Sequence, residues 1–301
     1  MSDMPIELSL GPLLFNWPAP LVETFYARIA ETACIDRVYL GEVVCGKRAP
    51  LLADALARAA ERLCTAGKTV VWSSMSLPTN PRERRAGRAL AALDDLVEIN
   101  DISALADRAR DAPFVAGPLL NVYNEGAARE LMARGCVRLC ANVELPLTSI
   151  ADLARACPTL ELEVFAFGRL PLALSGRCYH ARAHGRQRDT CQYVCDQDPD
   201  GRAVRTLDGQ EFLAVNGVQT LSHGVQIVDL PPAVLRGAGI RALRLSPHSC
   251  DMVAVAAAFR RFADGDTDAA ALRAAVRETR PPGALISGYL RGGAGLQAAD
   301  G

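Results

Sequence analysis

The stretch "RVYLGEVVCGKRAPLLADALARAAERLCTAGKTVVWSS" (37–74) contains the unit that decides the fold. Two short apolar runs, "RVYLGE" (37–42) and "TVVWSS" (69–74), flank a longer segment whose apolar residues recur at helical spacing. Those residues are Leu52, Ala55, Leu56, Ala59 and Leu63. A strand, a helix and a second strand in this order are typical of a parallel sheet covered by helices.

The same alternation runs along the whole chain. Six further candidate strands bring the total to eight, and they lie at 6–10, 96–100, 114–117, 137–141, 160–166 and 240–246. Candidate helices lie at 51–64, 81–93, 125–134, 148–156, 251–263 and 267–279. Eight such repeats predict an α/β protein with a TIM-type (β/α)8 barrel. A doubly wound open sheet is the alternative, because strand closure is not visible in a sequence.

One segment interrupts this rhythm after the seventh strand. Residues 175–228 contain no barrel-like helix, and within them "GRAVRTLDGQEFLAVNG" (201–217) has two alternating runs joined by Asp208-Gly209. Asp-Gly between such runs favours a β-hairpin. We therefore expect a cysteine-bearing insertion and a hairpin on the face where barrel active sites lie. The expected organisation is a single barrel domain over 1–280 and a C-terminal tail over 281–301.

Composition and charge exclude several classes of partner. The formal net charge is −1 and the isoelectric point is about 6.4, which argues against a nucleic-acid partner. The N-terminus lacks the basic flank of a signal peptide, and the apolar run 252–259 is too short to span a bilayer. We expect a cytoplasmic protein with no transmembrane segment. Its ten cysteines are then better explained as buried thiols or metal ligands than as disulfides.

Three cysteines stand in the most polar stretch of the chain: Cys178, Cys191 and Cys195. A set of soft thiolates suits zinc, Cu(I) or an iron–sulfur cluster. Structural zinc usually shows two close C-x-x-C pairs, which are missing here. A radical S-adenosylmethionine signature also fails, because Asp198 occupies its third cysteine position. The spacing therefore predicts a metal site whose kind stays open.

Several residues could complete this site. The candidates for a fourth ligand are His180, His184, His223, Cys45 and Cys250. Cys45 directly follows the second strand, where ligands emerge at the barrel mouth, and Cys250 follows the last strand and is its main rival. Lys47 and Arg48 beside Cys45 would offset the charge of an anionic cluster. Five other cysteines are expected in the core: Cys34, Cys64, Cys136, Cys140 and Cys157.

A few polar residues near the strand ends are further candidates. Glu42 could orient the Cys45 loop through hydrogen bonds, or cap a backbone turn. Asn121, Asn142 and Glu144 could line the barrel mouth, and His223 and His248 are expected in loops on that side. The arginines of the insertion could neutralise thiolates or bind an anionic substrate; they are Arg177, Arg182, Arg186 and Arg188. No G-x-G-x-x-G follows a strand, so we expect no nucleotide cofactor.

The stretch "LPLALSGRCYHARAHGRQRDTCQYVC" (170–195) resembles the signature of the collagenase-like peptidase (U-32 type) family of barrel proteins. Within that family, "VYLGEVVCGKR" (38–48), "EFLAVNGVQTLSHG" (211–224) and "LRLSP" (243–247) are similar to the UbiV group of oxygen-independent ubiquinone biosynthesis proteins. The resemblance implies a 4Fe-4S cluster held by Cys45, Cys178, Cys191 and Cys195.

The resemblance also implies a biological setting. It implies a heterodimer with a UbiU-like sister subunit, a UbiT-like lipid-carrier protein, and hydroxylation of a ubiquinone precursor without dioxygen. Prephenate is a family-level suggestion for the oxygen donor. A non-catalytic structural or electron-transfer partner is the alternative, and a peptidase is less favoured.

Two positions depart from the pattern of the family. Ser222 stands where most members keep a later cysteine, which explains why a ligand from the second strand is needed. "LRLSPHS" (243–249) replaces a Lys-x-Glu-Gly-Arg stretch, and the missing Glu and Arg put peptidase or independent catalytic activity in doubt.

Overall fold

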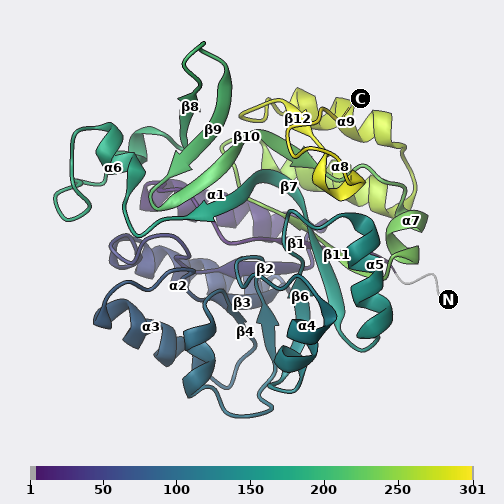
Figure 1. Cartoon of the computed structure of the whole chain (residues 1–301), viewed down its shortest axis with the longest axis horizontal. Helices are drawn as coiled ribbons and strands as arrows, with labels where there is room; N and C mark the ends of the chain where they lie inside the picture. Colours follow the sequence, from purple (N-terminus) through teal and green to yellow (C-terminus); the bar gives the residue numbers. More distant parts are fainter. Residues whose placement is uncertain (1–4, 300–301) are drawn as a thin grey trace.

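A computed structural model describes residues 5–299, apart from the side chain of Asp107. Within these residues, eight parallel strands close into a barrel (Figure 1). The strands are β1 (Glu7–Leu10), β2 (Arg37–Leu40), β3 (Thr69–Ser73), β4 (Val97–Ile99), β5 (Phe114–Ala116), β6 (Cys136–Cys140), β7 (Glu161–Leu174) and β11 (Ile240–Leu245). β11 pairs with both β1 and β7, for example at Glu7↔Ala242 and Val164↔Leu243, and this double pairing closes the sheet. The barrel prediction is confirmed, and the open-sheet alternative is wrong.

Helices surround the barrel (Figure 1). They are α1 (Ala19–Glu31), α2 (Ala49–Thr65), α3 (Pro81–Ala91), α4 (Glu125–Met132), α5 (Leu147–Ala156), α7 (Pro232–Gly237), α8 (Met252–Asp264) and α9 (Ala269–Glu278). A 3-10 helix, η1 (Ile102–Asp107), replaces an α-helix after β4. The apolar stripe expected in α2 is the face that this helix buries. No helix among the described residues is both long and apolar enough to cross a membrane.

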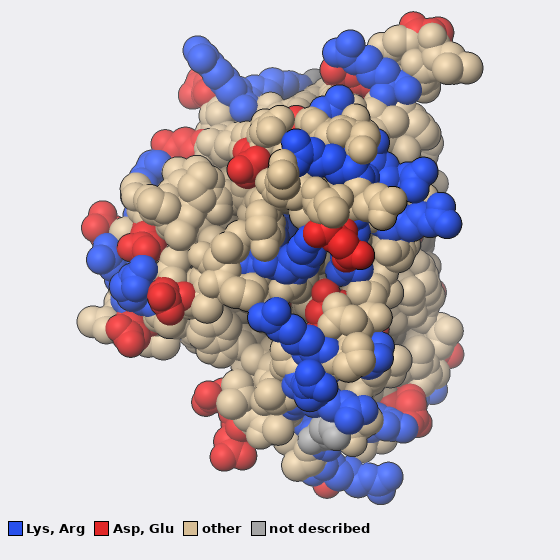
Figure 2. Space-filling model, turned by 90° about the vertical axis from the view of Figure 1, so that its left-hand side faces the viewer, with Lys and Arg blue, Asp and Glu red and all other residues tan. Residues whose placement is uncertain are grey.

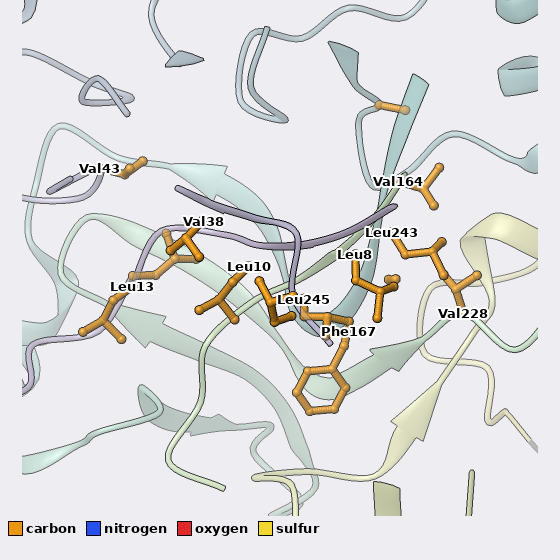
Figure 3. Packing of buried hydrophobic residues seen from close by; sticks show 14 of the residues in the cluster. Leu8, Leu10, Leu13, Val38, Val43, Val164, Phe167, Val228, Leu243 and Leu245 are labelled. Atoms are coloured by element: carbon orange, nitrogen blue, oxygen red, sulfur yellow. The ribbon is translucent and has the colours of Figure 1, made fainter. Parts of the chain in front are cut away.

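The main hydrophobic core lies between the barrel and its helices. Because strand residues alternate between two faces, Leu8 and Leu10 of β1 point outward, as do Leu243 and Leu245 of β11. Figure 3 shows these leucines lying together, with Val164 close by. All of them are at most a few per cent exposed. Burial of such side chains stabilises the fold by roughly 1.5–3 kcal/mol for each residue.

The interior of the barrel is unusually polar. Barrel interiors are mostly filled by branched aliphatic residues, but here Arg244 of β11 lies between Glu98 of β4 and Glu163 of β7. The Arg244 guanidinium also stacks on the Tyr39 ring, 3.9 Å from its centroid. The Tyr39 hydroxyl donates to Glu163 Oε2 over 3.0 Å. A buried charge network therefore occupies the middle of the barrel.

Strand β7 continues well beyond the barrel. Its first half pairs with β6 and β11, and its second half pairs antiparallel with β10 (Gln219–Ile227). The expected hairpin is present, because β8 (Arg202–Arg205) pairs antiparallel with β9 (Glu211–Asn216), and β9 pairs with β10. A short helix, α6 (Tyr179–Ala183), and a 3-10 helix, η2 (Val194–Gln197), lie between β7 and the hairpin. The excursion after the seventh strand is therefore a small second sheet with a cysteine-bearing loop.

The described part of the C-terminal segment folds onto this excursion. Strand β12 (Leu285–Ile286) pairs in parallel with β10, at Val225↔Leu285. Ile286 then forms an antiparallel bridge with Ala298. A further 3-10 helix, η3 (Tyr289–Arg291), lies between these two pairings. The last two residues of the expected tail, 300–301, lie outside the described residues.

Candidate metal centre

Four cysteines line one small cavity. Cys45 comes from the loop after β2, and Cys178, Cys191 and Cys195 come from the loop after β7. The remaining lining is Arg48, His180, Ala181, Arg188, Tyr193, Val194 and Gly217. Two segments more than 130 residues apart in the sequence thus meet at the carboxyl ends of β2 and β7. The meeting point is on the face where barrel enzymes carry their active sites.

The spacing of the four sulfurs limits what they could hold. Zn–S bonds of about 2.3 Å in a tetrahedral site place ligand sulfurs roughly 3.8 Å apart. Among the described residues, no three of these four sulfurs lie within 4.8 Å of one another. The four thiols are a donor set that suits zinc, Cu(I) or an iron–sulfur cluster, so the kind of metal stays open here.

The loop after β7 is folded tightly around its cysteines. Cys178 precedes α6 as its N-cap, and its Sγ accepts a hydrogen bond from the Ala181 backbone N–H over 3.4 Å. Gln192 and Tyr193 have φ values of 49° and 57°, a left-handed conformation that is uncommon outside glycine. Two such residues in a row turn the chain sharply between Cys191 and Cys195. Strained backbone of this kind is often found at functional sites.

Glu42 fixes the loop that carries Cys45. Its Oε1 accepts hydrogen bonds from the backbone N–H groups of Val44 (2.8 Å) and Cys45 (2.9 Å). Its Oε2 lies 3.6 Å from Arg48 Nε. These hydrogen bonds hold the loop that carries Cys45, which is one of the two roles that the sequence suggested for Glu42.

Arg48 places a buried positive charge beside the thiols. Its side chain is 1 % exposed, and its Nη1 donates to the Leu14 carbonyl over 3.1 Å. Its Nε and Nη2 have no hydrogen-bond partner. Burial alone would lower the pKa of Arg48, but Glu42, Cys195 and Cys45 together raise it. Unpaired donors on a buried cation are costly, so an anionic group in the cavity would satisfy them.

Lys47 ties the two cysteine-bearing loops together. Its Nζ donates to the carbonyls of Arg188 (2.8 Å) and Asp189 (3.0 Å) and lies 3.6 Å from Cys191 Sγ. The ammonium also lies 5.7 Å from the centroid of the Tyr193 ring. Lys47 and Arg48 both lie close to the cysteines, because Arg48 lines the cavity and Lys47 contacts Cys191. The sequence suggested this position for both residues.

The protonation of the thiols follows from their burial. Burial raises the pKa of the Cys195 thiol to about 11, although the positive charge of Arg48 acts in the opposite direction and lowers it. Burial also raises the pKa of Cys178. These thiols are protonated at neutral pH, and a metal would have to displace their protons on binding.

A second group of potential ligands adjoins the cavity. One ring nitrogen of His180, one of His184 and one oxygen of Asp198 lie within 4.8 Å of one another. However, His180 Nε2 is 2.8 Å from Asp198 Oδ2, and Arg202 Nη1 lies 3.1 Å from His184 Nε2. These contacts use His180 Nε2 and His184 Nε2, whereas His180 Nδ1 is buried without a hydrogen-bond partner. Because His180 also lines the cysteine cavity, it stays open as an alternative ligand.

The other cysteines are placed elsewhere. Cys250 Sγ lies 3.9 Å from Met252 Sδ, and burial raises the pKa of its thiol to about 11. Cys136, Cys140 and Cys157 are buried, as expected, and Cys34 is partly buried. Cys64 is exposed, so its expected place in the core is wrong. It directly follows Leu63 and lies at the edge of the stripe that α2 buries.

Of the two histidines expected in loops, His248 lies in the loop after β11, whereas His223 lies in a strand. Ser222 is buried within β10, where its hydroxyl donates to the Gly224 carbonyl (2.6 Å) and accepts from the Leu170 N–H (2.8 Å). His223 lies in the same strand rather than in a loop, and its Nε2 is 3.0 Å from Glu211 Oε2. His248 is buried, with Nδ1 3.0 Å from the Ser246 carbonyl and Nε2 3.3 Å from the Arg169 N–H. Burial lowers its pKa to about 4, so it is neutral.

The polar residues expected at the barrel mouth are found there. Asn121, Asn142 and Glu144 line an open pocket at the ends of β5, β6 and β7, together with Tyr123, which was not expected there. Asn142 Oδ1 accepts from the Val122 N–H over 2.8 Å. The charge network inside the barrel was missed, because a buried arginine and a surface arginine look alike in a sequence.

The face that carries the cysteine-bearing loop is rich in basic residues. Figure 2 shows Lys and Arg side chains gathered on this face, which is on the left of Figure 1, where α6 and α3 lie. Exposed arginines from these two regions are Arg82, Arg84, Arg85, Arg88, Arg177 and Arg182. The chain as a whole has a net charge of −1, so its charge is unevenly distributed.

Comparison with known proteins gives one extensive match. The family model described as Peptidase family U32 matches residues 22–280, which is most of the chain. Two solved structures share limited similarity. An enolase from Agrobacterium radiobacter matches with 13% identity and a TM-score of 0.35, over 79% of this chain and 67% of that one. A truncated 3-deoxy-D-arabino-heptulosonate 7-phosphate synthase from Thermotoga maritima matches with 10% identity and a TM-score of 0.34, over 92% and 86%.

Proposed function

We propose a function from the premise that the chain belongs to Peptidase family U32. The proposal is that this protein is the iron–sulfur subunit of an oxygen-independent hydroxylase of the ubiquinone ring. Cys45, Cys178, Cys191 and Cys195 would hold a 4Fe-4S cluster. A UbiU-like sister subunit would complete the enzyme, and a UbiT-like lipid carrier would deliver the ubiquinone precursor.

The convergence of four cysteines on one small cavity is the observation that carries this proposal. Three of them come from one loop whose sequence is among the most polar of the chain, where a buried structural thiol is less expected. Thiolate ligands from all four positions match the donor set of a 4Fe-4S cluster. The resemblance to the UbiV group supports the same four positions as ligands. It is also the reason for proposing that the protein acts in ubiquinone biosynthesis.

The surroundings of the cavity support an anionic group. A cluster with four thiolate ligands carries net negative charge, and Arg48 offers it Nη2, a buried donor without a hydrogen-bond partner. The Ala181 N–H donates to Cys178 Sγ, and Lys47 Nζ lies beside Cys191 Sγ. Hydrogen bonds and positive charge at the sulfurs raise the reduction potential of a cluster.

The chemistry requires an oxygen donor and a two-electron change. Hydroxylation replaces a ring C–H bond by C–OH, so the ring loses two electrons and a donor other than dioxygen supplies the oxygen atom and is reduced. A bound 4Fe-4S cluster supplies one-electron transfer. In this scheme Glu42, Lys47 and Arg48 position the thiolates and balance their charge.

Iron analysis of protein purified without oxygen tests the cofactor. Wild type should be brown and contain about four iron atoms and four sulfides per chain, as the composition of a 4Fe-4S cluster requires. Cys45→Ala should lose most of the colour and iron, whereas Cys250→Ala should keep both. Colourless wild-type protein, or equal iron in the two variants, would contradict the cluster assignment.

A deletion strain tests the pathway separately. Growth without oxygen should then give little ubiquinone, and growth in air should give normal levels. Cys45→Ala should fail to restore anaerobic synthesis. Normal anaerobic ubiquinone in the deletion strain would refute the pathway while leaving the cluster untouched.

A second candidate is a non-catalytic partner whose cluster is structural or transfers electrons. The loss of the Lys-x-Glu-Gly-Arg stretch, replaced by residues 243–249, favours it over independent catalysis. Copurification with the sister subunit separates the two. A complex that forms and hydroxylates without the cluster would refute any redox role for it.

A further inference from the structure

One face of the molecule collects positive charge beside the candidate metal centre (Figure 2). It is formed by α3 and by residues 175–197 of the cysteine-bearing loop, and we call it the basic face. These two segments contain eight arginines against three acidic residues, which gives a net charge of +5. The whole chain has a net charge of −1, so all the other residues together have −6. The basic face therefore differs in sign from the rest of the protein.

Several arginines of the basic face have no acidic partner within the chain. Among the described residues, five exposed arginines of this face form no ion pair: Arg82, Arg84, Arg85, Arg177 and Arg182. By contrast, Arg28, Arg58 and Arg134 elsewhere on the surface each pair with a carboxylate. A guanidinium binds carboxylates through a planar fork of donors. The unpaired groups are therefore available to carboxylates of another molecule.

Three of these arginines lie where they oppose the stability of their own helix. Helix α3 begins at Pro81, so Arg82 and Arg84 lie in its first turn and Arg85 follows directly. The N-terminal end of a helix carries partial positive charge, so cations there are unfavourable and anions are favourable. The stability of α3 therefore does not explain these three arginines, and binding of an anionic surface does.

Arg188 connects the basic face to the cysteine cavity. Its Nη1 donates to Thr79 Oγ1 (2.7 Å) and its Nη2 donates to Glu83 Oε1 (3.0 Å), which joins the loop to the start of α3. The same side chain lines the cavity of the four cysteines. Three of these cysteines are only partly buried: Cys45, Cys178 and Cys195. A group held by them would lie close to the surface, beside the basic face.

The composition of the basic face suits an acidic protein better than a membrane. Helices that bind at a membrane surface bury large apolar side chains in it. Helix α3 exposes no large apolar side chain, and the loop exposes one, Tyr179. A mostly polar surface of one charge sign is suited to fast, short-lived association with a protein of opposite charge. Electron-transfer proteins associate in this way, through small interfaces.

We propose that the basic face docks a small electron-carrier protein with an acidic surface. The carrier gives up one electron next to the four cysteines, and the metal group that they hold takes it up, with no bond or proton exchanged. This electron sets the oxidation state of the metal group and does not enter the two-electron balance of the hydroxylation. The electron step rests on the function proposed above, because it needs the cluster. The docking surface does not rest on it.

Binding of an acidic probe protein tests the docking surface. The probe is a plant-type [2Fe-2S] ferredoxin, and titration calorimetry gives its affinity for the full-length protein purified without oxygen. One ferredoxin should bind per chain. The affinity should fall at least about tenfold between about 0.01 M and 0.15 M salt, because the screening length shrinks from about 30 Å to about 8 Å.

Charge reversal on α3 provides the matched variants. Arg84→Glu/Arg85→Glu should lower the affinity for ferredoxin at least about tenfold at low salt. The fold should be kept, because both side chains are exposed and acidic residues suit the start of a helix. Arg84→Lys/Arg85→Lys should keep most of the affinity. Arg129→Glu/Arg261→Glu makes the same change of charge on α4 and α8, outside the basic face, and should lose much less affinity.

The electron step is measured on the same samples. Reduced ferredoxin should reduce the protein in a rapid-mixing experiment, and the rate should fall at least about tenfold in Arg84→Glu/Arg85→Glu. In Arg129→Glu/Arg261→Glu the rate should stay close to that of the wild type. Binding without reduction would overturn the assignment of the partner as an electron carrier.

The outcomes separate the docking surface from the metal centre. Equal losses in the two glutamate variants, or an affinity that salt does not change, would overturn the docking surface. Tighter binding to anionic lipid vesicles than to ferredoxin would overturn it in favour of a membrane. Cys45→Ala should still bind ferredoxin, because its basic face is intact. Ferredoxin binding by wild type that contains no iron counts against the proposed function alone, and a full cluster without ferredoxin binding counts against the docking surface alone.

Discussion

Lys47 Nζ lies 3.6 Å from Cys191 Sγ, although the two residues belong to loops on different strands of the barrel. The same ammonium donates to the carbonyls of Arg188 and Asp189. One side chain thus joins the Cys45 loop to the loop that carries the other three thiols. It contributes both a mechanical link and a positive charge at the candidate cluster.

We expect Lys47→Met to make a bound cluster more labile and to lower its reduction potential. The substitution removes a positive charge near a sulfur and frees the two loops from each other. Iron release to a chelator should become several-fold faster, and anaerobic redox titration should give a more negative midpoint. Lys68→Met is the control, because Lys68 also binds two backbone carbonyls but lies away from the cavity. An unchanged midpoint in Lys47→Met would argue against the contact.

Arg48→Met should destabilise the fold and lose the cluster. It leaves the buried Glu42 carboxylate without its cation, and breaking a buried ion pair costs about 3–5 kcal/mol. Chemical denaturation and iron analysis measure the two effects. The double variant Glu42→Gln/Arg48→Met removes both charges and should regain much of the stability without regaining iron. Full iron in the double variant would show that Arg48 serves the fold alone.

Gly217→Ala should loosen the hairpin at the cavity. Gly217 has a φ of 60°, and a Cβ there would lie 3.2 Å from Arg48 Nη2 and 3.3 Å from Val44 Cγ1. The left-handed backbone alone costs about 1 kcal/mol for a residue with a Cβ. Gly209→Ala is the matched control, because Gly209 has a φ of 86° with nothing within 4 Å of its added Cβ. Gly217→Ala should lose more stability and iron than Gly209→Ala, and equal losses would show that the contact with Arg48 is unimportant.

Acid should weaken the barrel through Glu163. Burial would raise the pKa of this carboxyl, but Arg244 and Arg138 lower it from 4.5 to about 2. The folded-state pKa is below the unfolded one, so the contribution of Glu163 is complete above about pH 4.5 and is lost as pH falls towards 2. Urea unfolding between pH 6 and 3 should show this decline.

Glu163→Gln checks the assignment of that decline. The variant should be less stable by about 3 kcal/mol at pH 7, because Arg244 keeps Glu98 but loses one partner. Its stability should depend less on pH between 4.5 and 3. Glu130→Gln, an exposed substitution, should leave the wild-type curve unchanged. An equally steep decline in Glu163→Gln would assign the effect to other carboxyls.

The barrel could be predicted from local patterns because each unit repeats them. The strand at 37–42 and the helix at 51–64 have clear apolar periods, and the structure confirms both. Strand β7 was expected to end at 166 but continues to Leu174. Arg169 and Pro171 interrupt the apolar pattern by which a strand is recognised in a sequence, so this extension was not predicted. It pairs with β10, whose residues lie about 50 positions later in the chain.

The site was predictable only in part, for a similar reason. Cys45 was singled out because it follows a strand, and the barrel register brings it to the cavity. The role of Arg244 was not predictable, because its partners Glu98 and Glu163 lie far away in the sequence and are brought together by barrel closure. Cys64 was wrongly predicted to be buried. It lies next to the apolar stripe of α2, and the sequence does not show whether a residue at the edge of such a stripe faces the core or the solvent.

The wide separation of Cys45 from the other three cysteines has a consequence for biosynthesis. Cys45 leaves the ribosome 150 residues before Cys195, which takes on the order of ten seconds at ordinary rates of translation. β11, which closes the barrel, is made later still. In a truncated chain, Cys45 therefore lacks the other three cysteines of the cavity. A cluster held by all four positions, as proposed, would form only after Cys195 has been synthesised.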